Sequence, residues 1–220
     1  MTREYRNSEG LLHRDGDLPA QEREDGIKWW WKNGKVHREG GRHAVENGTY
    51  KAWMVNGKQH REGGLPAVEN GNHKQWWVNG LLHRDVGPAI ERADGTAEWY
   101  VNGQRHRNGG LPAAEYVNGD KEWWVNGRLH REDGLPACEY AHGKSQEWWV
   151  NGIHLSEQNR IAYGAFCQKM KENKRVRAQK KIYFWWIQIC YDLEHPSGCG
   201  KRMAQLNLIS FEKMMVPTIG

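Results

Sequence analysis

Aromatic, polar and turn-forming residues repeat in a fixed order along the first two-thirds of the chain. Asn-Gly occurs at 33–34, 56–57, 79–80, 102–103, 126–127 and 151–152, so successive pairs are 23, 23, 23, 24 and 25 residues apart. Two aromatic or large apolar residues precede each pair, as in the run Trp-Trp-Val-Asn-Gly at 76–80. A fixed period of this length indicates a repeat architecture in which each unit packs on its neighbours.

Each unit also contains a second turn. Leu-Pro-Ala or a related sequence follows the Asn-Gly, a Glu stands two residues after the Ala, and another Gly-bearing pair comes next. Asn-Gly and Asp-Gly favour the tight turns that join antiparallel strands, so two turns predict two strands per unit. The second turns are Asp25-Gly26, Asn47-Gly48, Asn70-Gly71, Asp94-Gly95, Asn118-Gly119 and His142-Gly143.

The Asn-Gly turn fixes an expected strand register. A two-residue loop at 79–80 places Trp77 opposite Leu82 and Trp76 opposite His83, and the two pairs point to opposite faces because side chains alternate along a strand. Stacking such hairpins predicts an all-β repeat fold, an elongated single-layer antiparallel sheet of about a dozen short strands. Equivalent residues of successive units should lie two strand spacings apart, about 10 Å.

The pattern changes at Ser156, which divides the chain into a repeat array at 1–154 and a C-terminal segment at 155–220. The Gly-spaced turns stop there, and Ser156 is a suitable N-cap for a helix. Ile161, Ala165 and Met170 approximate a helical stripe. A helix or a buried strand fits 176–189 equally well, and a short helix fits 203–214. We expect this mainly helical segment to cap the open end of the sheet.

The composition limits how such a sheet can be stabilised. Hydrophobic residues make up only 38% of the 220 residues and the mean hydropathy is −0.93, yet the chain has 13 Trp against 3 Phe. A disordered chain would lack aromatic residues. A large aliphatic core is also excluded, so indole rings, which bury roughly 150–250 Å² each, must supply most of the burial.

The repeated motif resembles that of a known family. Residues 77–83 (Trp-Val-Asn-Gly-Leu-Leu-His) resemble the membrane occupation and recognition nexus (MORN) repeat, although Arg84 stands where that family usually has Gly. The Trp-Trp-Val-Asn-Gly form is similar to repeats in large amoeba-infecting DNA viruses, the marseillevirus type in particular. The likeness covers about residues 9–152. It implies a hairpin solenoid and a viral or virion-associated protein, and it implies no reaction.

The first aromatic residue of each pair is the candidate for a partner contact or for the core. A single-layer sheet has two faces and too few aliphatic residues to cover both, so part of the aromatic surface is expected to remain open. An exposed row of Trp would be a protein-recognition surface. These candidates are Trp30, Trp53, Trp76, Trp99, Trp123 and Trp148.

The other repeated polar residues favour structural roles. We expect the His of each unit to pack on its facing Trp and bond to a turn carbonyl, and the following Arg to form a cross-strand ion pair with the unit's Glu. Neighbouring His residues about 10 Å apart cannot share a zinc ion. An active site is one asymmetric constellation, whereas these residues are copied in each unit, so the sequence predicts no enzyme and no cofactor.

Charge is divided unevenly between the two parts. Residues 1–154 carry a net charge of −1 and residues 155–220 carry +6. The principal prediction is a scaffold that binds a protein along its aromatic face. The alternative is binding of anionic phospholipid or nucleic acid through a basic run. The candidate phosphate contacts are Lys169, Lys171, Lys174, Arg175, Arg177, Lys180 and Lys181.

The remaining features concern cysteine and location. Four Cys are too few for a disulfide framework, which favours a reducing compartment. Cys190, His195 and Cys199 offer three ligands, and a closed zinc site would need Cys167 or another residue as the fourth, so no metal is predicted. No apolar run approaches the ~20 residues of a membrane span and the N-terminus lacks a signal peptide. The expected location is therefore the cytoplasm of an infected cell or the virion.

Overall fold

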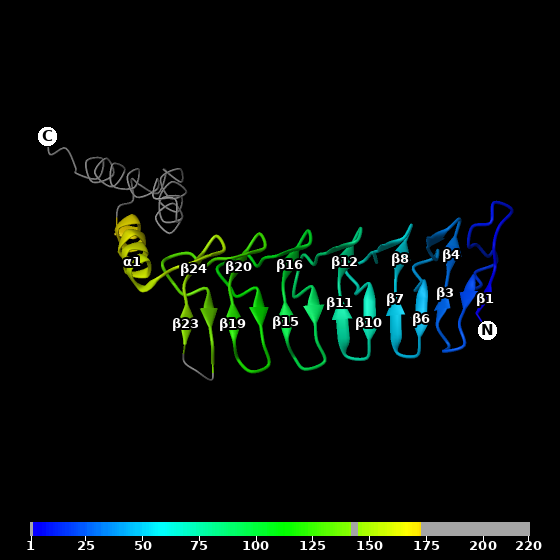
Figure 1. Cartoon of the computed structure of the whole chain (residues 1–220), viewed down its shortest axis with the longest axis horizontal. Helices are drawn as coiled ribbons and strands as arrows, with labels where there is room; N and C mark the ends of the chain where they lie inside the picture. Colours follow the sequence, from blue (N-terminus) through cyan, green and yellow to red (C-terminus); the bar gives the residue numbers. More distant parts are fainter. Residues whose placement is uncertain (1, 142–144, 173–220) are drawn as a thin grey trace.

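The strands of the protein line up in a single long array. The computed structural model describes residues 2–141 and 145–172. A sheet of short antiparallel strands runs along the array, small hairpins project from one end of its strands, and a helix lies at the C-terminal side (Figure 1). All neighbouring strands of the sheet follow the order of the chain, so each unit pairs only with the units before and after it.

The long sheet has thirteen strands of two or three residues. Antiparallel pairing joins every neighbour, as in Val68 opposite Gln75. The strands are β1 (Arg3–Glu4), β2 (Gln21–Glu22), β3 (Lys28–Trp29), β6 (Val45–Asn47), β7 (Tyr50–Ala52), β10 (Val68–Asn70), β11 (His73–Gln75), β14 (Ile90–Glu91), β15 (Ala97–Glu98), β18 (Ala114–Glu115), β19 (Lys121–Glu122), β22 (Cys138–Glu139) and β23 (Gln146–Glu147).

Six separate two-stranded hairpins carry the Asn-Gly turns. The Asn and Gly of each turn both have positive φ, for example 52° at Asn79 and 83° at Gly80, which is the conformation that a type I′ turn requires. The hairpins pair β4 (Trp31–Lys32) with β5 (Lys35–Val36), β8 (Met54–Val55) with β9 (Lys58–Gln59), β12 (Trp77–Val78) with β13 (Leu81–Leu82), β16 (Tyr100–Val101) with β17 (Gln104–Arg105), β20 (Trp124–Val125) with β21 (Arg128–Leu129), and β24 (Trp149–Val150) with β25 (Ile153–His154).

The prediction of two strands per unit is wrong, because most units have four. The chain leaves the long sheet at the first aromatic residue. The Trp76 N–H donates to Ala89 O at 2.8 Å on the sheet side, whereas the Trp76 carbonyl accepts from His83 N at 3.0 Å on the hairpin side. The predicted hairpin register is confirmed, since Trp77 lies opposite Leu82.

The two rows of side chains in the long sheet differ in character. One row reads Val45, Ala52, Val68 and Gln75 across four strands, and its first three members are buried. The other row alternates Glu and Lys across the same strands, so opposite charges face each other at each pairing. Its members there are Glu46, Lys51, Glu69 and Lys74.

Backbone bonds couple each small hairpin to the one before it. The Gly80 N–H donates to Gln59 O at 2.8 Å, and the neighbouring Asn79 N–H donates to His60 Nδ1 at 3.2 Å. Both turn N–H groups are therefore satisfied by the preceding unit. Buried or half-buried backbone donors need such partners, so the Asn-Gly turn serves as a coupling element as well as a reversal of the chain.

Helix α1 (Glu157–Glu172) follows the last hairpin. Ser156 Oγ accepts from Asn159 N at 3.4 Å, as the N-cap prediction requires. The predicted helical stripe is wrong in phase, because Ile161 is 62% exposed and Ala165 is also exposed. The buried positions are Tyr163, Phe166 and Cys167, which pack with Val150 and Leu155 while Met170 lies partly buried beside them. The elements expected at 176–189 and 203–214 lie outside the described residues.

Candidate partner-binding surface

The first tryptophan row (Trp30, Trp53, Trp76, Trp99, Trp123 and Trp148) lies inside the array. Trp76 is only 5% exposed, and its indole Nε1 donates to Gly64 O at 2.8 Å. Trp30, Trp53 and Trp123 are also buried, and Trp99 and Trp148 are half-buried. The chain uses these indoles as core, so they offer a partner little direct surface.

An arginine covers each of these rings. The Arg84 guanidinium carbon lies 3.6 Å from the centre of the Trp76 ring, while Nη1 donates to Pro88 O at 2.9 Å and to Glu91 Oε1 at 2.7 Å. One cation thus makes a cation–π contact and two hydrogen bonds. The same stacking joins Arg38 to Trp30, Arg61 to Trp53, Arg107 to Trp99 and Arg131 to Trp123.

The predicted Arg–Glu pairs form in every unit but one. In the exception, Arg38 bonds Asp17 at 2.8 Å, and Glu46 instead bonds His43 Nε2 at 2.9 Å. His43 occupies the place of the usual Pro, and its imidazole takes the carboxylate that the arginine would otherwise hold. The pairs that form as predicted are Arg14–Glu22, Arg61–Glu69, Arg84–Glu91, Arg107–Glu115 and Arg131–Glu139.

The histidines bond to a turn, but to a different group than expected. The imidazole Nδ1 of His60 accepts from the backbone N–H of Asn79 in the next unit, where a carbonyl partner was predicted. Because Nδ1 accepts, the ring is neutral with its proton on Nε2. The same bond links His13, His37, His83, His106 and His130 to the following Asn.

His130 is the most enclosed member of this row. Its residue is 4% exposed, and burial lowers the pKa of the imidazole below its usual value of 6.5. Burial disfavours the imidazolium form, which also matches the acceptor role of Nδ1. In the described ranges 2–141 and 145–172, no three His, Cys, Asp or Glu side chains gather as a metal cluster would require. Cys190, His195 and Cys199 lie beyond these ranges.

The second member of each aromatic pair points to the reverse side of the sheet. Side chains alternate, so Trp77 shares a face with Gln75, and its Nε1 donates to Gln75 Oε1 at 2.9 Å. All members of this second row are half-buried. They are Trp31, Met54, Trp77, Tyr100, Trp124 and Trp149.

One polar cluster on this reverse side departs from the repeat and was not predicted. Glu98 is 2% exposed and accepts hydrogen bonds from Arg92 Nη2 at 2.6 Å, from Arg105 and from the Tyr100 hydroxyl at 3.1 Å. Burial alone would raise the pKa of Glu98, but Arg92 and Arg105 hold it below its ordinary value. The carboxylate is fully bonded, so it is an ion network without a free base or nucleophile.

The loops that begin with His-Arg form a second candidate surface, which we call the loop face (residues 13–18, 37–42, 60–65, 83–87, 106–111 and 130–135). The loop face is hollowed between neighbouring loops. The groove between the third and fourth loops has walls that include Glu62, Leu65, Asp85 and Val86, and its floor includes Trp76. The covered tryptophans therefore lie directly beneath this surface.

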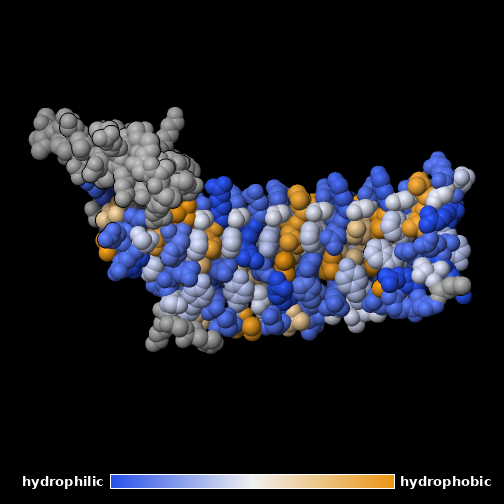
Figure 2. All heavy atoms as spheres, viewed as in Figure 1, coloured by the Kyte–Doolittle hydropathy of each residue, from blue (hydrophilic) through white to orange (hydrophobic). Residues whose placement is uncertain are grey.

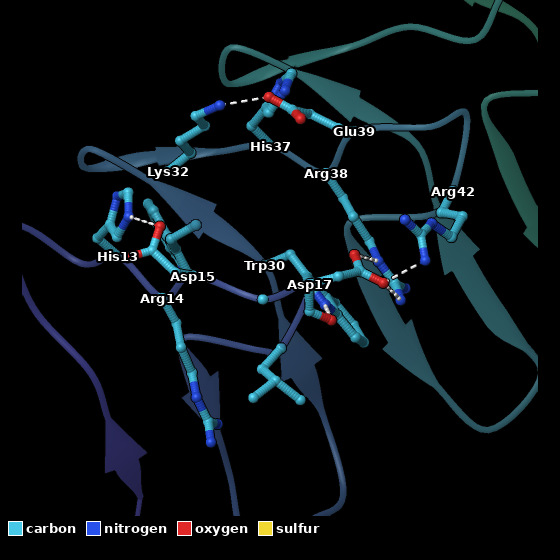
Figure 3. A pocket seen from close by; sticks show the side chains of 13 residues that line it. His13, Arg14, Asp15, Asp17, Trp30, Lys32, His37, Arg38, Glu39 and Arg42 are labelled. Carbon is cyan, nitrogen blue, oxygen red and sulfur yellow. Dashed lines mark hydrogen bonds and ion pairs between the residues drawn. The ribbon is translucent and has the colours of Figure 1, made fainter.

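A groove at the equivalent place lies nearer the N-terminus, between the first two loops (Figure 3). Two of its carboxylates form ion pairs within the chain, because Asp17 pairs with Arg38 and Arg42 while Glu39 pairs with Lys32. The third, Asp15, bonds His13 and its side chain stays 97% accessible. The groove between the third and fourth loops has no such lysine, since Val78 takes the place of Lys32. Both of its carboxylates, Glu62 and Asp85, are as open to solvent as Asp15, at 93% and 91% accessibility.

The loop face presents one apolar side chain in nearly every unit. Leu65 and Leu111 are each 50% exposed, and Val86 is 83% exposed. Leu18 and Leu135 hold the same place, whereas the second loop has Arg42. Apolar side chains recur at intervals along the array, separated by hydrophilic ones (Figure 2). Single exposed apolar residues are ordinary, but these recur at equivalent positions of successive units.

Only two of the candidate phosphate contacts lie in the described part of the chain. Lys169 and Lys171 are exposed on α1, and Lys171 Nζ lies 3.4 Å from Asp133. Lys174, Arg175, Arg177, Lys180 and Lys181 lie outside the described residues.

Two comparisons of the chain with known proteins found no match. No family model matches it, and no curated protein matches it. Across residues 2–141 and 145–172, helix length and hydropathy fall short of what a membrane-crossing segment requires.

Proposed function

We propose that the chain is a non-enzymatic scaffold that binds a protein partner along its loop face. The observation that carries the proposal is the row of half-exposed leucines at equivalent loop positions, at 46–50% exposure for Leu18, Leu65, Leu111 and Leu135. These side chains lie above the first tryptophan row, so a partner would contact the loops rather than the indoles. Apolar residues set among charged ones are typical of reversible protein interfaces.

The state of the charged groups supports a binding role over a catalytic one. Each half-buried arginine of the loop face is already held by a carboxylate, a carbonyl and a ring, as Arg84 is. Burial raises the pKa of the Cys138 thiol to about 12, which keeps it protonated and unreactive. A catalytic group needs an unsatisfied or activated atom facing solvent.

The proposal includes a terminal role for α1. The last unit lacks the His-Arg pair, and Leu155 N donates to Trp148 O at 2.8 Å where a histidine does so in other units. Arg160 of α1 then lies 4.4 Å from the centre of the Trp148 ring, in place of the missing arginine. On this proposal α1 closes an array of about 23-residue MORN-like units, in a viral or virion-associated protein.

The test is capture of a partner by the full chain from cell extract, followed by identification of the captured protein. The double variant Leu65→Asp/Leu111→Asp places charge on the loop face without touching the indole core. We expect it to lose the protein that the unaltered chain captures, because a buried aspartate at an interface is costly.

The control is Val117→Asp, which changes another exposed apolar residue, 67% accessible, at a sheet turn away from the loops. It should capture the same protein as the unaltered chain. Equal capture by the loop-face variant and the control would refute the proposal. Capture that disappears as salt rises, with no effect of the leucine changes, would favour the phosphate-binding alternative instead.

A further inference from the structure

The loop face repeats at a distance set by the sheet. Each unit contributes two strands to the long sheet, and neighbouring strands lie about 4.7–4.9 Å apart, so equivalent loop residues recur about every 9.4–9.8 Å. A ligand that uses several units at once must present equivalent side chains at this spacing, all toward one side. The spacing therefore selects the backbone conformation of the ligand.

Among regular conformations, polyproline II matches best. It rises about 3.1 Å per residue with three residues per turn, so every third side chain points the same way at about 9.3 Å. A β-strand repeats its face every two residues, at about 6.6–6.8 Å, and residues three apart point to opposite sides. An α-helix returns to one face after seven residues at about 10.5 Å, and this mismatch of roughly 1 Å accumulates with each unit.

The charge of the loop face identifies which side chains would repeat. Five of the six loops carry a carboxylate two residues after the His. Three of these side chains are almost fully accessible: Asp15 at 97%, Glu62 at 93% and Asp85 at 91%. The Nε2 of His83 lies 3.0 Å from Asp85 Oδ1, so a neutral imidazole holds the carboxylate in place without neutralising it. A row of such anions attracts lysine or arginine.

We propose that the loop face binds a basic polyproline II segment of a partner protein, with a lysine or arginine at every third residue. This inference rests on the proposed scaffold function and names its partner. The basic side chains would meet successive carboxylates, centred on the groove that contains Glu62 and Asp85. The intervening proline rings would pack on the half-exposed Leu65 and on Val86, which line the same groove.

The role of the loop carboxylates can be tested with variants that remove negative charge and with one that adds it. Asn108 takes the place of the carboxylate in its loop and bonds His106 Nε2 at 2.9 Å in the same way. Glu62→Gln/Asp85→Asn therefore converts two loops to a form that the protein already tolerates. Conversely, Asn108→Asp extends the row of carboxylates. The matched control is Asp25→Asn/Asp94→Asn. It makes the same charge change at two sheet turns where other units already have Asn, such as Asn47.

The probe is a synthetic peptide of five Lys-Pro-Pro triplets, and binding to the full chain is measured by calorimetry at low salt. A second peptide has the same composition but all of its lysines at one end. We expect the periodic peptide to bind more tightly. Glu62→Gln/Asp85→Asn should weaken it by roughly two- to fivefold per carboxylate, Asn108→Asp should strengthen it by a similar factor, and the control pair should leave it unchanged.

Equal binding of the two peptides, no binding of either, or equal effects of the loop variant and its control would each overturn the inference. Binding of the peptide and capture of a partner test the further inference and the proposed function separately. If Leu65→Asp/Leu111→Asp abolishes capture of a partner while the periodic peptide does not bind, the loop face is an interface for a ligand of another conformation. If Leu65→Asp/Leu111→Asp still captures the partner and the periodic peptide does not bind, the loop face is not an interface.

Discussion

The arginine after each histidine shows how single residues hold this thin protein together. Arg61 stacks on Trp53 at 3.6 Å and bonds both Pro66 O and Glu69. A surface ion pair alone contributes only about 0 to 1 kcal/mol. Here the guanidinium also shields an indole from water, so its aliphatic stem and planar head take the place of a missing second layer.

Replacing a buried indole should cost more than replacing an outer one. Trp76→Ala removes a side chain that is 5% exposed, together with its bond to Gly64 O, and should reduce the free energy of unfolding by roughly 3–5 kcal/mol. Trp77→Ala alters a half-buried ring and should cost clearly less. Chemical denaturation of the two variants provides the comparison, and equal losses would contradict the placement of the core.

Protonation of His130 should destabilise the array. The folded protein holds this imidazole neutral because burial lowers its pKa, whereas the unfolded chain takes up a proton near pH 6.5. Its contribution is therefore complete above that pH and declines as the pH falls below it, until the lowered folded-state value is reached. Denaturation midpoints measured from pH 8 to pH 5 should fall less steeply for His130→Gln. Parallel curves would show that His130 does not titrate in this way.

The sequence predicted the residues of the core better than their contacts. The recurrence of Arg and Glu identified their pairing, and too few aliphatic residues pointed to indoles as the core. The stacking of Arg84 on Trp76 was missed because it depends on the bend at Trp76, where the N–H and the carbonyl serve different sheets. Glu98 was missed because Arg105 stands where other units have Val36, Gln59, Leu82 or Leu129, so no repeated pattern pairs it with the carboxylate.

At the scale of elements, the small hairpins and α1 depend on close approach to the neighbouring unit. Gly134 has a φ of 73°, and a Cβ built on it would lie 3.1 Å from the Gly164 Cα of α1. The equivalent Gly64 has a φ of 68° and nothing within 4 Å. Two glycines in the same loop position thus differ only in whether a helix lies against them.

This difference allows the docking of α1 to be tested. Gly64→Ala and Gly134→Ala should both cost about 1–2 kcal/mol through their positive φ. Only Gly134→Ala should also push α1 away from the last loop. Its new Cβ would meet the backbone of α1 at Gly164, and backbone cannot rotate away as a flexible side chain can. Hydrogen exchange of the α1 amides should accelerate in Gly134→Ala and stay unchanged in Gly64→Ala. The same exchange rates in both would mean that α1 is not seated on that loop.

For α1, the sequence pattern predicted the helix correctly but assigned the wrong residues to its buried face. Ser156 indicated the start correctly, since its Oγ accepts from Asn159 N. The aliphatic Ile161 was assigned to the buried stripe, yet Tyr163 and Phe166 are buried instead. The orientation is decided by the aromatic and thiol side chains that fit Val150 and Leu155, and a single short helix contains too few apolar residues to reveal this alone.

At the scale of the molecule, the array is a sequence of nearest-neighbour contacts. The strands of the long sheet pair in the order in which they occur along the chain. Each Asn-Gly turn donates both of its N–H groups to the preceding unit, as Gly103 N does to Leu82 O at 2.8 Å. Stability should then approximate a sum of unit and interface contributions. One internal unit can be removed while the contacts between the remaining units are preserved.

The most direct test of this linear arrangement is small-angle X-ray scattering of the full chain and of a variant lacking residues 57–79, in which Asn56 joins Gly80. The deletion removes one complete repeat and restores the Asn-Gly turn. We expect the variant to remain folded and its maximum dimension to shorten by about 10 Å, two strand spacings. An unfolded variant, or a folded one with an unchanged maximum dimension, would contradict an array in which each unit contacts only its neighbours.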